Sequence, residues 1–271
     1  MLPATGQPAA ERIASLDSVE DCREIALLLS SLEFSWDIER ALEFALFRTY
    51  AVPSISGLLA RTGEFEQRPR KRYDDTELIL AEIMENGFDS DRGRRALARM
   101  NDMHGRFRIA DSDLRYVLST FVFEPIRWLE RYGRRCMTAH EQEAWFRYYR
   151  GLGERMGIPG IPDDLEEFWR FNQNYEASHF RLAESNKVMA TATSNLLLGF
   201  YLPSWLLWAG RPVVRAIMDP PLIVAMGFAP APAWLRSLVA TAMKLRARVL
   251  RRLPLRRRPR LLTRVRRPTY P

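Results

Sequence analysis

The sequence predicts an all-α fold, and three observations support this. Apolar residues recur every three or four positions in successive segments, which is the period of a helix with one buried face. No segment shows the strict alternation of apolar and polar residues, bounded by Gly and Asn, that a half-buried strand needs. With 271 residues, of which 47% are hydrophobic, the chain is long and apolar enough to bury a core and is not a disordered polypeptide.

We expect three parts along the chain. Residues 1–17, rich in Ala, Pro and Gly, have no periodic apolar face and are expected to form a mobile lead-in. Residues 18–198 are expected to form one helical domain, and residues 199–271 an apolar and then basic segment that associates with a membrane. Because the first residues lack a basic start followed by an apolar run, they do not resemble a secretory signal, and we expect a cytoplasmic protein.

Residues that favour helix ends mark the helices in the first half of the domain. Small polar side chains and Pro are common at the first positions of a helix, and Gly is common just after its end. Such residues border the apolar segments at Asp37, Pro53, Asp74 or Asp75, Gly87, and Asp89 or Ser90. Four helices are therefore expected between residues 37 and 107.

Three more helices are expected in the second half of the domain. Ser112 begins a long helix in which Pro125 is expected to cause a kink. Thr138 and Glu141 have the spacing of a capping box, in which each side chain binds a backbone amide at the start of a helix. A further helix is expected over residues 163–180.

The C-terminal part joins the most apolar segment of the chain to its most basic one. Residues 195–210 are interrupted by Pro203 and fall short of the roughly 20 apolar residues that a spanning helix needs. The last predicted helix, over residues 233–253, has an apolar and a basic side, as in helices that lie on a membrane surface. Its apolar side consists of Trp234, Leu238, Met243 and Leu245.

The basic residues are concentrated at this end. The formal charge is +8, but residues 244–267 hold twelve cations and no acid, which leaves 29 basic against 33 acidic residues elsewhere. Three roles are open for such a tail: a solvated charged segment that only keeps the protein soluble, a nucleic-acid-binding segment, or a segment that binds anionic lipid. We favour anionic lipid over nucleic acid, because Leu and Val separate the arginines where stacking aromatic residues would be expected, and because the body of the chain is acidic.

Cysteine and histidine are too few for most metal sites. Two cysteines cannot form a disulfide framework, and no spacing of Cys and His resembles a zinc site. Glu176 and His179 have the Glu-x-x-His spacing of di-iron bundles, but such a site needs the motif twice and the chain has it once. We therefore expect His179 to be bonded to its own helix, and His140, in the first turn of a helix, to lie at the surface.

His104 lies on the apolar side of its predicted helix. Leu97, Met100, His104 and Phe107 recur at three and four positions, so the imidazole is expected to point into the core. A neutral imidazole in an apolar setting, next to the small Gly105, is suited to ligate haem iron. A lone histidine on an apolar face is more often a core residue satisfied by a hydrogen bond, so periodicity alone favours that interpretation over a haem ligand.

Arg72, Asp75 and Thr76 form a second candidate group. Arg72 and Thr76 are four residues apart and share a face if their helix begins before them. Beside a haem, a guanidinium and a hydroxyl are suited to hold polarised dioxygen. The alternative is a helix entrance in which Asp74 and Asp75 cap the following segment.

At these residues the chain resembles the catalytic-domain family shared by rubber oxygenase (latex clearing protein) and the membrane-bound oxygenase of mycophenolic acid biosynthesis. The resemblance spans most of the chain, and its combination of segments is specific. The segments are YAVPSISGLLARTGEF (50–65), RKRYDDT (70–76), NDMHGRF (101–107), DLRYVLSTFVFEPIRW (113–128) and YGRRCMTAHEQEAWFRYYRGLGERMGIPGIPDDLEEF (132–168).

The resemblance implies a globin-like helical fold that holds haem b. The family's proximal histidine falls on His104, and its distal arginine and threonine fall on Arg72 and Thr76. Rubber oxygenases have a lysine immediately before that threonine, where this chain has Asp75. This exchange of a cation for an anion favours the mycophenolic-type branch over rubber cleavage, and Asp75 is either a proton acceptor or a helix cap.

Together these inferences predict a haem b-dependent oxygenase. It would use O2 to oxidise or cleave an apolar isoprenoid or lipid-like substrate, while peripherally associated with a membrane through Trp205, Trp208 and Trp234. Two other classes stay open: a haem- or lipid-binding helical protein without turnover, and a structural membrane-associated bundle in which His104 belongs to the core. The first would show a ligand-induced spectral change without product, and the second no bound chromophore.

Overall fold

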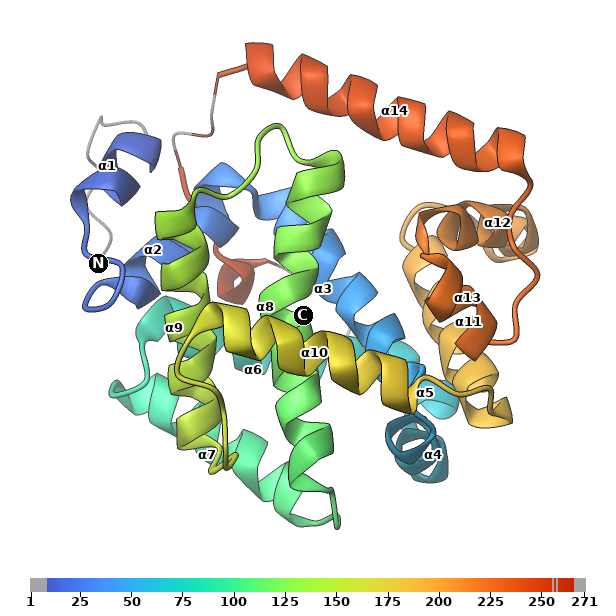
Figure 1. Ribbon diagram of the computed structural model, residues 1–271, viewed down its shortest axis with the longest axis horizontal. Helices are drawn as coiled ribbons and strands as arrows, with labels where there is room; N and C mark the ends of the chain where they lie inside the picture. The colour runs from blue at the N-terminus through green and yellow to red at the C-terminus, as the bar shows by residue number, and fades with distance from the viewer. Residues whose placement is uncertain (1–8, 255, 257, 266–271) are drawn as a thin grey trace.

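The computed structural model describes residues 9–265 apart from residues 255 and 257 (Figure 1). Within these ranges the chain is helical throughout and contains no strand, which confirms the predicted all-α class. No helix in the described ranges combines the length and the apolar character that crossing a bilayer requires.

The elements, in chain order, have the following bounds. They are α1 (Ala9–Ser15), α2 (Cys22–Leu28), the π-helical turn η1 (Leu29–Glu33), α3 (Ser35–Tyr50), α4 (Pro53–Thr62), α5 (Glu64–Gln67), α6 (Pro69–Asn86), α7 (Asp91–Gly105), α8 (Asp111–Tyr132), α9 (Ala139–Arg155), α10 (Leu165–His179), α11 (Glu184–Leu198), the 3₁₀ turn η2 (Ser204–Leu206), α12 (Leu207–Ile217), α13 (Pro220–Ala225), α14 (Ala233–Arg252) and the 3₁₀ turn η3 (Leu262–Arg264).

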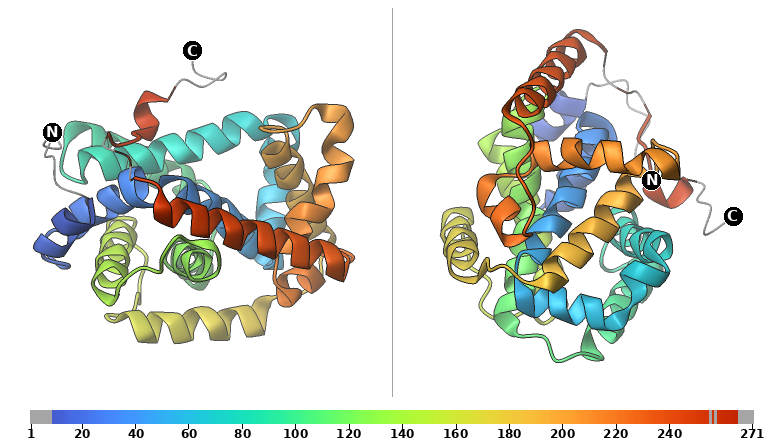
Figure 2. Two further views of the ribbon diagram at one scale, coloured as in Figure 1. Left: turned by 90° about the horizontal axis from the view of Figure 1, so that it is seen from above. Right: turned by 90° about the vertical axis from the view of Figure 1, so that its right-hand side faces the viewer.

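Helix α8 lies at the centre of the molecule. It packs along α3, and α9 and α10 also contact it. In the view from above, α10 is drawn below α8, and α3 and then α6 are drawn above it (Figure 2, left). Helix α8 therefore lies between α10 on one side and α3 and α6 on the other. Helices α11, α12 and α13 form one side of the molecule, and α14 runs along the top (Figure 1).

One large apolar cluster holds these helices together. Its largest fully buried side chains include Trp145, Phe47 and Phe123. The cluster continues into the C-terminal part, where Val214 and Met226 belong to it. The expected domain boundary at residue 198 is therefore not a boundary of the core, because α12 and α13 bury apolar side chains in the same cluster as the preceding helices.

The N-terminal part also differs from expectation. Residues 9–15 form helix α1, although an unstructured lead-in was expected up to residue 17. The physical reason is that Ile13 and Leu16 are buried in the main apolar cluster, which stabilises a helix too short to form alone. Residues 1–8 lie outside the described residues.

Several predicted helix ends are confirmed. The Ser90 side chain accepts a hydrogen bond from the Gly93 amide at the start of α7. Thr138 and Glu141 form the predicted capping box of α9, with both hydrogen bonds present.

Pro125 lies inside α8, which runs unbroken over its 22 residues.

The predicted start of α6 is wrong. The helix begins at Pro69, five residues before Asp74, because Pro is well suited to the first helical position. Asp74 and Asp75 therefore do not cap it but lie inside it. Each pairs with a cation one turn earlier: Asp74 with Arg70 at 2.9 Å and Asp75 with Lys71 at 2.7 Å.

A buried network of charged side chains joins α3 to three distant parts of the chain. Arg48 of α3 is 4% exposed and donates to Glu124 of α8 at 2.5 Å and to Glu176 of α10 at 2.9 Å. It also donates to Asp219, whose other oxygen accepts from the Leu222 amide at the start of α13. One guanidinium thus connects α3, α8, α10 and the C-terminal part.

Candidate functional site

The site is built on two consecutive helices. Only residues 87–90 separate α6 from α7, and the two helices pack against each other, so the start of α6 lies near the end of α7. This arrangement brings Arg72, in the first turns of α6, near His104, in the last turn of α7. The charge of Arg72 contributes to lowering the pKa of His104.

The imidazole of His104 is held in one orientation. Its Nδ1 lies 2.8 Å from the carbonyl oxygen of Met100, and because a carbonyl only accepts, Nδ1 carries the proton and donates it. This leaves the lone pair of the ring on Nε2. Burial, more than the nearby Arg72, lowers the pKa of the ring and keeps it neutral at neutral pH.

Arg72 and Thr76 do share a face of α6, as the sequence allowed. The Arg72 guanidinium donates to the Thr76 hydroxyl, which in turn donates to the Arg72 carbonyl at 3.0 Å. The guanidinium also lies over the ring of Phe65, with 5.7 Å between its carbon and the ring centroid. The two side chains are thus fixed relative to each other before any ligand binds.

Asp75 has a different setting. Its carboxylate is ion-paired with Lys71, and neighbouring residues of a helix point about 100° apart. The structure therefore gives Asp75 a partner on its own helix and directs it away from the direction that Arg72 and Thr76 share.

The residues present fit a haem. A neutral imidazole with its lone pair on Nε2 and a fixed Nδ1 hydrogen bond is the form that ligates iron, and the bonded carbonyl is the usual orienting partner. Gly105, the residue after His104, is exposed at the end of α7, and a side chain built on it would meet no atom within 4 Å. Arg72 supplies a cationic donor nearby.

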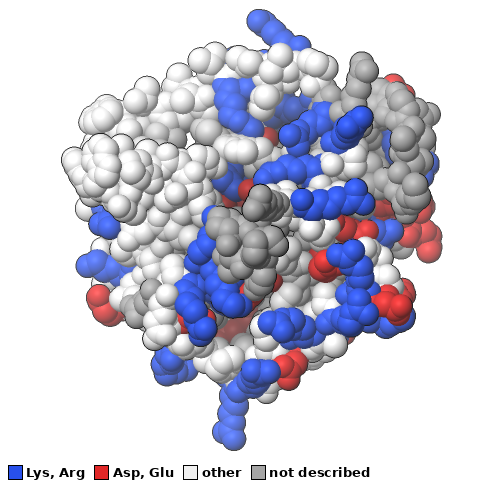
Figure 3. Space-filling model, turned by 180° about the vertical axis from the view of Figure 1, so that it is seen from behind, with Lys and Arg blue, Asp and Glu red and all other residues white. Residues whose placement is uncertain are grey.

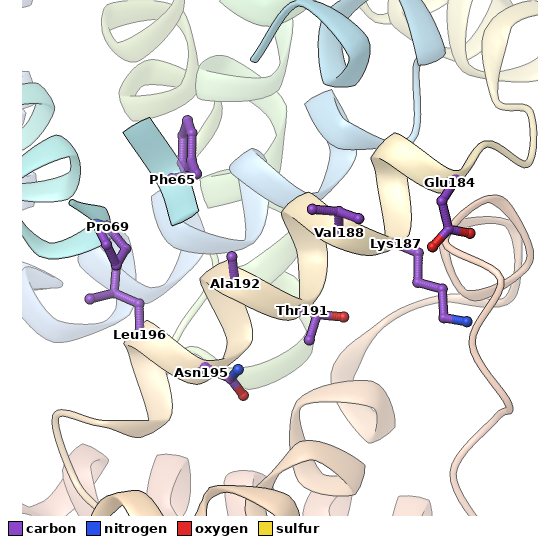
Figure 4. Close-up of a pocket in the computed structure, with 9 residues that line it drawn as sticks. All are labelled: Phe65, Pro69, Glu184, Lys187, Val188, Thr191, Ala192, Asn195 and Leu196. Atoms are coloured by element: carbon purple, nitrogen blue, oxygen red, sulfur yellow. The ribbon is translucent and has the colours of Figure 1, made fainter. Parts of the chain in front are cut away.

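A groove of about 640 Å³ lies along α11, and Figure 4 shows the residues that line it. Its apolar side is formed by Phe65, Pro69 and three side chains of one face of α11, namely Val188, Ala192 and Leu196. The remaining lining residues are Glu184, Lys187, Thr191 and Asn195. Phe65 contributes to the groove and also contacts Arg72, so the groove reaches the candidate site.

The groove residues of α11 were not identified from the sequence. The aromatic residues Tyr116, Phe121 and Trp128 belong to the apolar core or pack against it and do not line the groove: Tyr116 stacks on Tyr175, and Trp128 donates to Asp37. The sequence signal that could have indicated this groove is the run of small residues in α11. A helix face with Thr191, Ala192 and Asn195 leaves space beside its neighbours.

The structure gives no support to a di-iron site. Among the described residues, no three His, Cys, Asp or Glu side chains lie close enough to hold a metal ion. Glu176 is engaged by Arg48 and Arg127, while His179 is exposed and bonds to the Tyr175 carbonyl of its own helix at 3.0 Å.

Comparison with known proteins identifies a family to which the chain is similar. Residues 45–267 match the family described as ER-bound oxygenase mpaB/B'/Rubber oxygenase, catalytic domain. The chain is 32% identical over 256 residues to the ER-bound oxygenase mpaB' of Penicillium brevicompactum, covering 86% of this chain and 60% of that protein. It is 31% identical over 246 residues to mpaB of the same fungus, covering 81% and 62%.

A third relative is mpaB of Penicillium roqueforti, which is 30% identical over 237 residues, covering 81% of this chain and 79% of that protein. The chain spans less than two thirds of the length of the first two relatives.

Proposed function

The chain belongs to the family of the mpaB/B' and rubber oxygenase catalytic domain, and from this we propose that it is a haem b-dependent oxygenase acting on an apolar substrate. Family membership supports an oxygenase. The observation that carries the haem proposal is the pairing of a neutral, oriented His104 with Arg72 on the facing helix.

His104 is the residue that would hold the haem. Its Nε2 points away from the Met100 carbonyl, and the Nδ1 hydrogen bond fixes the plane of the ring. When bound, haem b supplies the iron at which O2 is activated. The protein contributes the axial ligand, the surrounding apolar side chains and the donors on the opposite helix.

Arg72, held in place by Thr76, would position O2 and exclude water. The Thr76 hydroxyl already donates its proton to the Arg72 carbonyl, so the donors available to a ligand come from the guanidinium. A fixed cation in a partly buried site stabilises developing negative charge without reorganisation. We propose no step for Asp75 beyond orienting α6 through Lys71.

The groove beside α11 is the proposed substrate site. Its apolar side suits an isoprenoid or other lipid-like chain, and Phe65 places that chain next to Arg72. Such a substrate partitions into bilayers, so we also propose that the protein works peripherally at a membrane surface. The basic C-terminal residues and the name ER-bound of the relatives support this.

Turnover distinguishes the proposed oxygenase from a haem or lipid carrier. The purified, haem-supplied protein is given O2 and a panel of prenylated small molecules and polyisoprenoids, and oxygen consumption and products are measured by electrode and mass spectrometry. An oxygenase gives a product containing oxygen from O2. A spectral change without product indicates a carrier and contradicts the proposal.

Replacing Arg72 by Leu is expected to lower kcat about 100- to 1,000-fold while the haem absorption remains. The reason is that the charge of the guanidinium acts at His104, whereas the proposed iron ligand itself is unchanged. Arg72→Lys keeps the charge but loses the planar fork, and is expected to recover only part of the rate. Arg99→Leu, at an exposed position of α7, is the matched control. A normal kcat in Arg72→Leu would exclude Arg72 from the reaction.

Filling the groove is expected to weaken substrate binding. Ala192→Trp adds a large ring at the apolar side of the groove, and we expect KM to rise about tenfold with an unchanged haem spectrum. Ala177→Trp, at an exposed position of α10, is the control. Equal KM values for both variants would show that the substrate binds elsewhere.

A further inference from the structure

The C-terminal part contains a long stretch of chain with almost no charge. Between residues 199 and 235 only three residues are charged, Arg211, Arg215 and Asp219, whereas 27% of the whole chain is charged. This stretch forms η2, α12, α13 and the start of α14. Figure 3 shows the consequence at its upper left, where a broad area without acidic or basic side chains is bordered by Lys and Arg.

The three charged residues are all engaged by the protein. Arg211 donates to Asn195 at 2.9 Å, and Asp219 accepts from the buried Arg48. Arg215 lies over the ring of Phe228 at 4.6 Å, and desolvation lowers its pKa. The surface of this part is therefore left to uncharged side chains.

Large apolar and aromatic side chains occupy that surface. Trp205 is 72% exposed, Trp208 69%, Val224 70% and Trp234 67%. They come from η2, α12, α13 and α14, and α12 packs directly against α14. Large aromatic residues gathered at this exposure are rare on soluble surfaces and mark interaction sites.

Helix α14 has a second apolar side that faces outward. At 100° per residue, Trp234, Leu238, Leu245 and Val249 fall within about 60° of one another. All are at least 49% exposed. The prediction that Met243 shares this side is wrong, because Met243 packs against the core on the opposite side of the helix.

The outward orientation of α14 is fixed by contacts on its inner side. Arg246 forms a bidentate ion pair with the buried Asp37, with N–O distances of 2.8 and 3.2 Å. Its guanidinium also lies over Trp36, 3.8 Å from the ring centroid. Ala247 on the same side is buried. The outer apolar side is therefore held in place and is not free to turn inward.

Cations line one edge of this outer side. Lys244, Arg248 and Arg251 are exposed and lie within about 60° of one another at 100° per residue, next to the stripe of Leu245 and Val249. Apolar and indole side chains flanked by Lys and Arg are the composition of surfaces that enter the headgroup region of an anionic bilayer.

We propose that these residues form a docking face for the surface of a bilayer that contains anionic phospholipid. The docking face consists of Trp205, Trp208, Val224, Trp234, Leu238, Leu245 and Val249, with Lys244, Arg248 and Arg251 at its edge. A second copy of the chain is disfavoured as the occupant, because a two-fold contact would bring the same cations together. The choice of a bilayer rests in part on the proposed function, since an apolar substrate collects there.

If the docking face lies on the bilayer, the proposed substrate groove lies beside the membrane. Asn195 lines the groove and is bonded to Arg211 of α12, whose neighbours Trp205 and Trp208 belong to the docking face. A lipid-like substrate leaving the bilayer at α12 would therefore meet α11 first.

Flotation of the full chain with lipid vesicles tests the docking face. Vesicles of phosphatidylcholine alone and of phosphatidylcholine with phosphatidylserine are compared. We expect the unaltered protein to bind mainly the anionic vesicles, with a blue shift of its tryptophan fluorescence. In Trp205→Ser/Trp208→Ser/Trp234→Ser the partition coefficient is expected to fall about 100-fold, because three large apolar surfaces no longer leave water.

Two further variants separate the contributions. Lys244→Glu/Arg248→Glu/Arg251→Glu is expected to remove the preference for anionic vesicles. Val19→Ser changes an exposed apolar residue in the N-terminal part, and is expected to bind as the unaltered protein does. Circular dichroism confirms that each variant is folded, as expected for substitutions at exposed positions.

The proposal is overturned if the triple tryptophan variant binds vesicles as tightly as the unaltered protein, or if neither binds. A dimer in sedimentation that the tryptophan substitutions dissociate, without vesicle binding, would assign the face to a second copy instead. Haem absorption and turnover of a short, water-soluble prenyl substrate are measured on the same variants. If the unaltered protein shows neither haem absorption nor turnover, the proposed function is contradicted, while the vesicle result still decides the docking face.

Discussion

His104→Ala is expected to lose the haem absorption band of the protein. The substitution removes an imidazole that is largely buried, whose pKa is lowered by that burial, and that is oriented by a backbone carbonyl. Loss of a partner that merely orients a metal ligand weakens metal binding about 10- to 100-fold, so loss of the ligand itself is expected to cost more than about 100-fold. The measurement is the Soret absorption of protein purified after expression with added haem.

The controls for this experiment are specific to the ligand. His179→Ala, at an exposed position that bonds to its own helix, is expected to keep the band. Imidazole added to His104→Ala is expected to restore part of it, because the truncated side chain leaves room for a free imidazole at the position of the missing ring. An unchanged Soret band in His104→Ala would show that another residue holds the haem, and a missing band in the unaltered protein would remove the haem proposal altogether.

Arg48→Met is expected to lower the free energy of unfolding by about 3–5 kcal/mol, because it leaves buried carboxylates without their main counter-charge. Arg48 pairs with Glu124, Glu176 and Asp219, and only Arg127 remains to balance them. The measurement is equilibrium unfolding in urea, followed by circular dichroism. The change in midpoint, at an unchanged slope, gives the loss of stability.

An exposed ion pair provides the comparison. Arg92 pairs with Glu82 and is 55% exposed, so Arg92→Met is expected to change stability by only about 0–1 kcal/mol. Equal effects for the two variants would mean that the Arg48 network does not link the C-terminal part to the rest of the fold.

The features that the sequence predicted correctly depend on residues close together in the chain. Helical periodicity, the Ser90 cap and the Thr138–Glu141 capping box involve neighbours within one turn. The shared face of Arg72 and Thr76 is also a local property once the helix runs through both. The orientation of His104 follows from its own helix, because its partner Met100 is four residues away.

The errors arise where distant packing decides a local choice. Asp74 and Asp75 have the composition of a helix start, but Pro69 lets α6 begin earlier and the packing of α6 on α7 keeps that first turn in place. The residues around Ile13 have little apolar periodicity, yet they form a helix because the core accepts two of their side chains.

By itself, the sequence determined the helical class, several helix ends and the face that Arg72 and Thr76 share, because each follows from interactions over three or four positions. Only the tertiary structure decided that α12 and α13 belong to the main core, that α11 lines a groove next to Arg72, and that α14 turns one apolar side inward and another to solvent. The physical reason is that periodicity shows which residues share a helix face. What that face meets depends on partners such as Arg48 with Asp219, or Arg246 with Asp37, which lie more than a hundred residues apart in the chain.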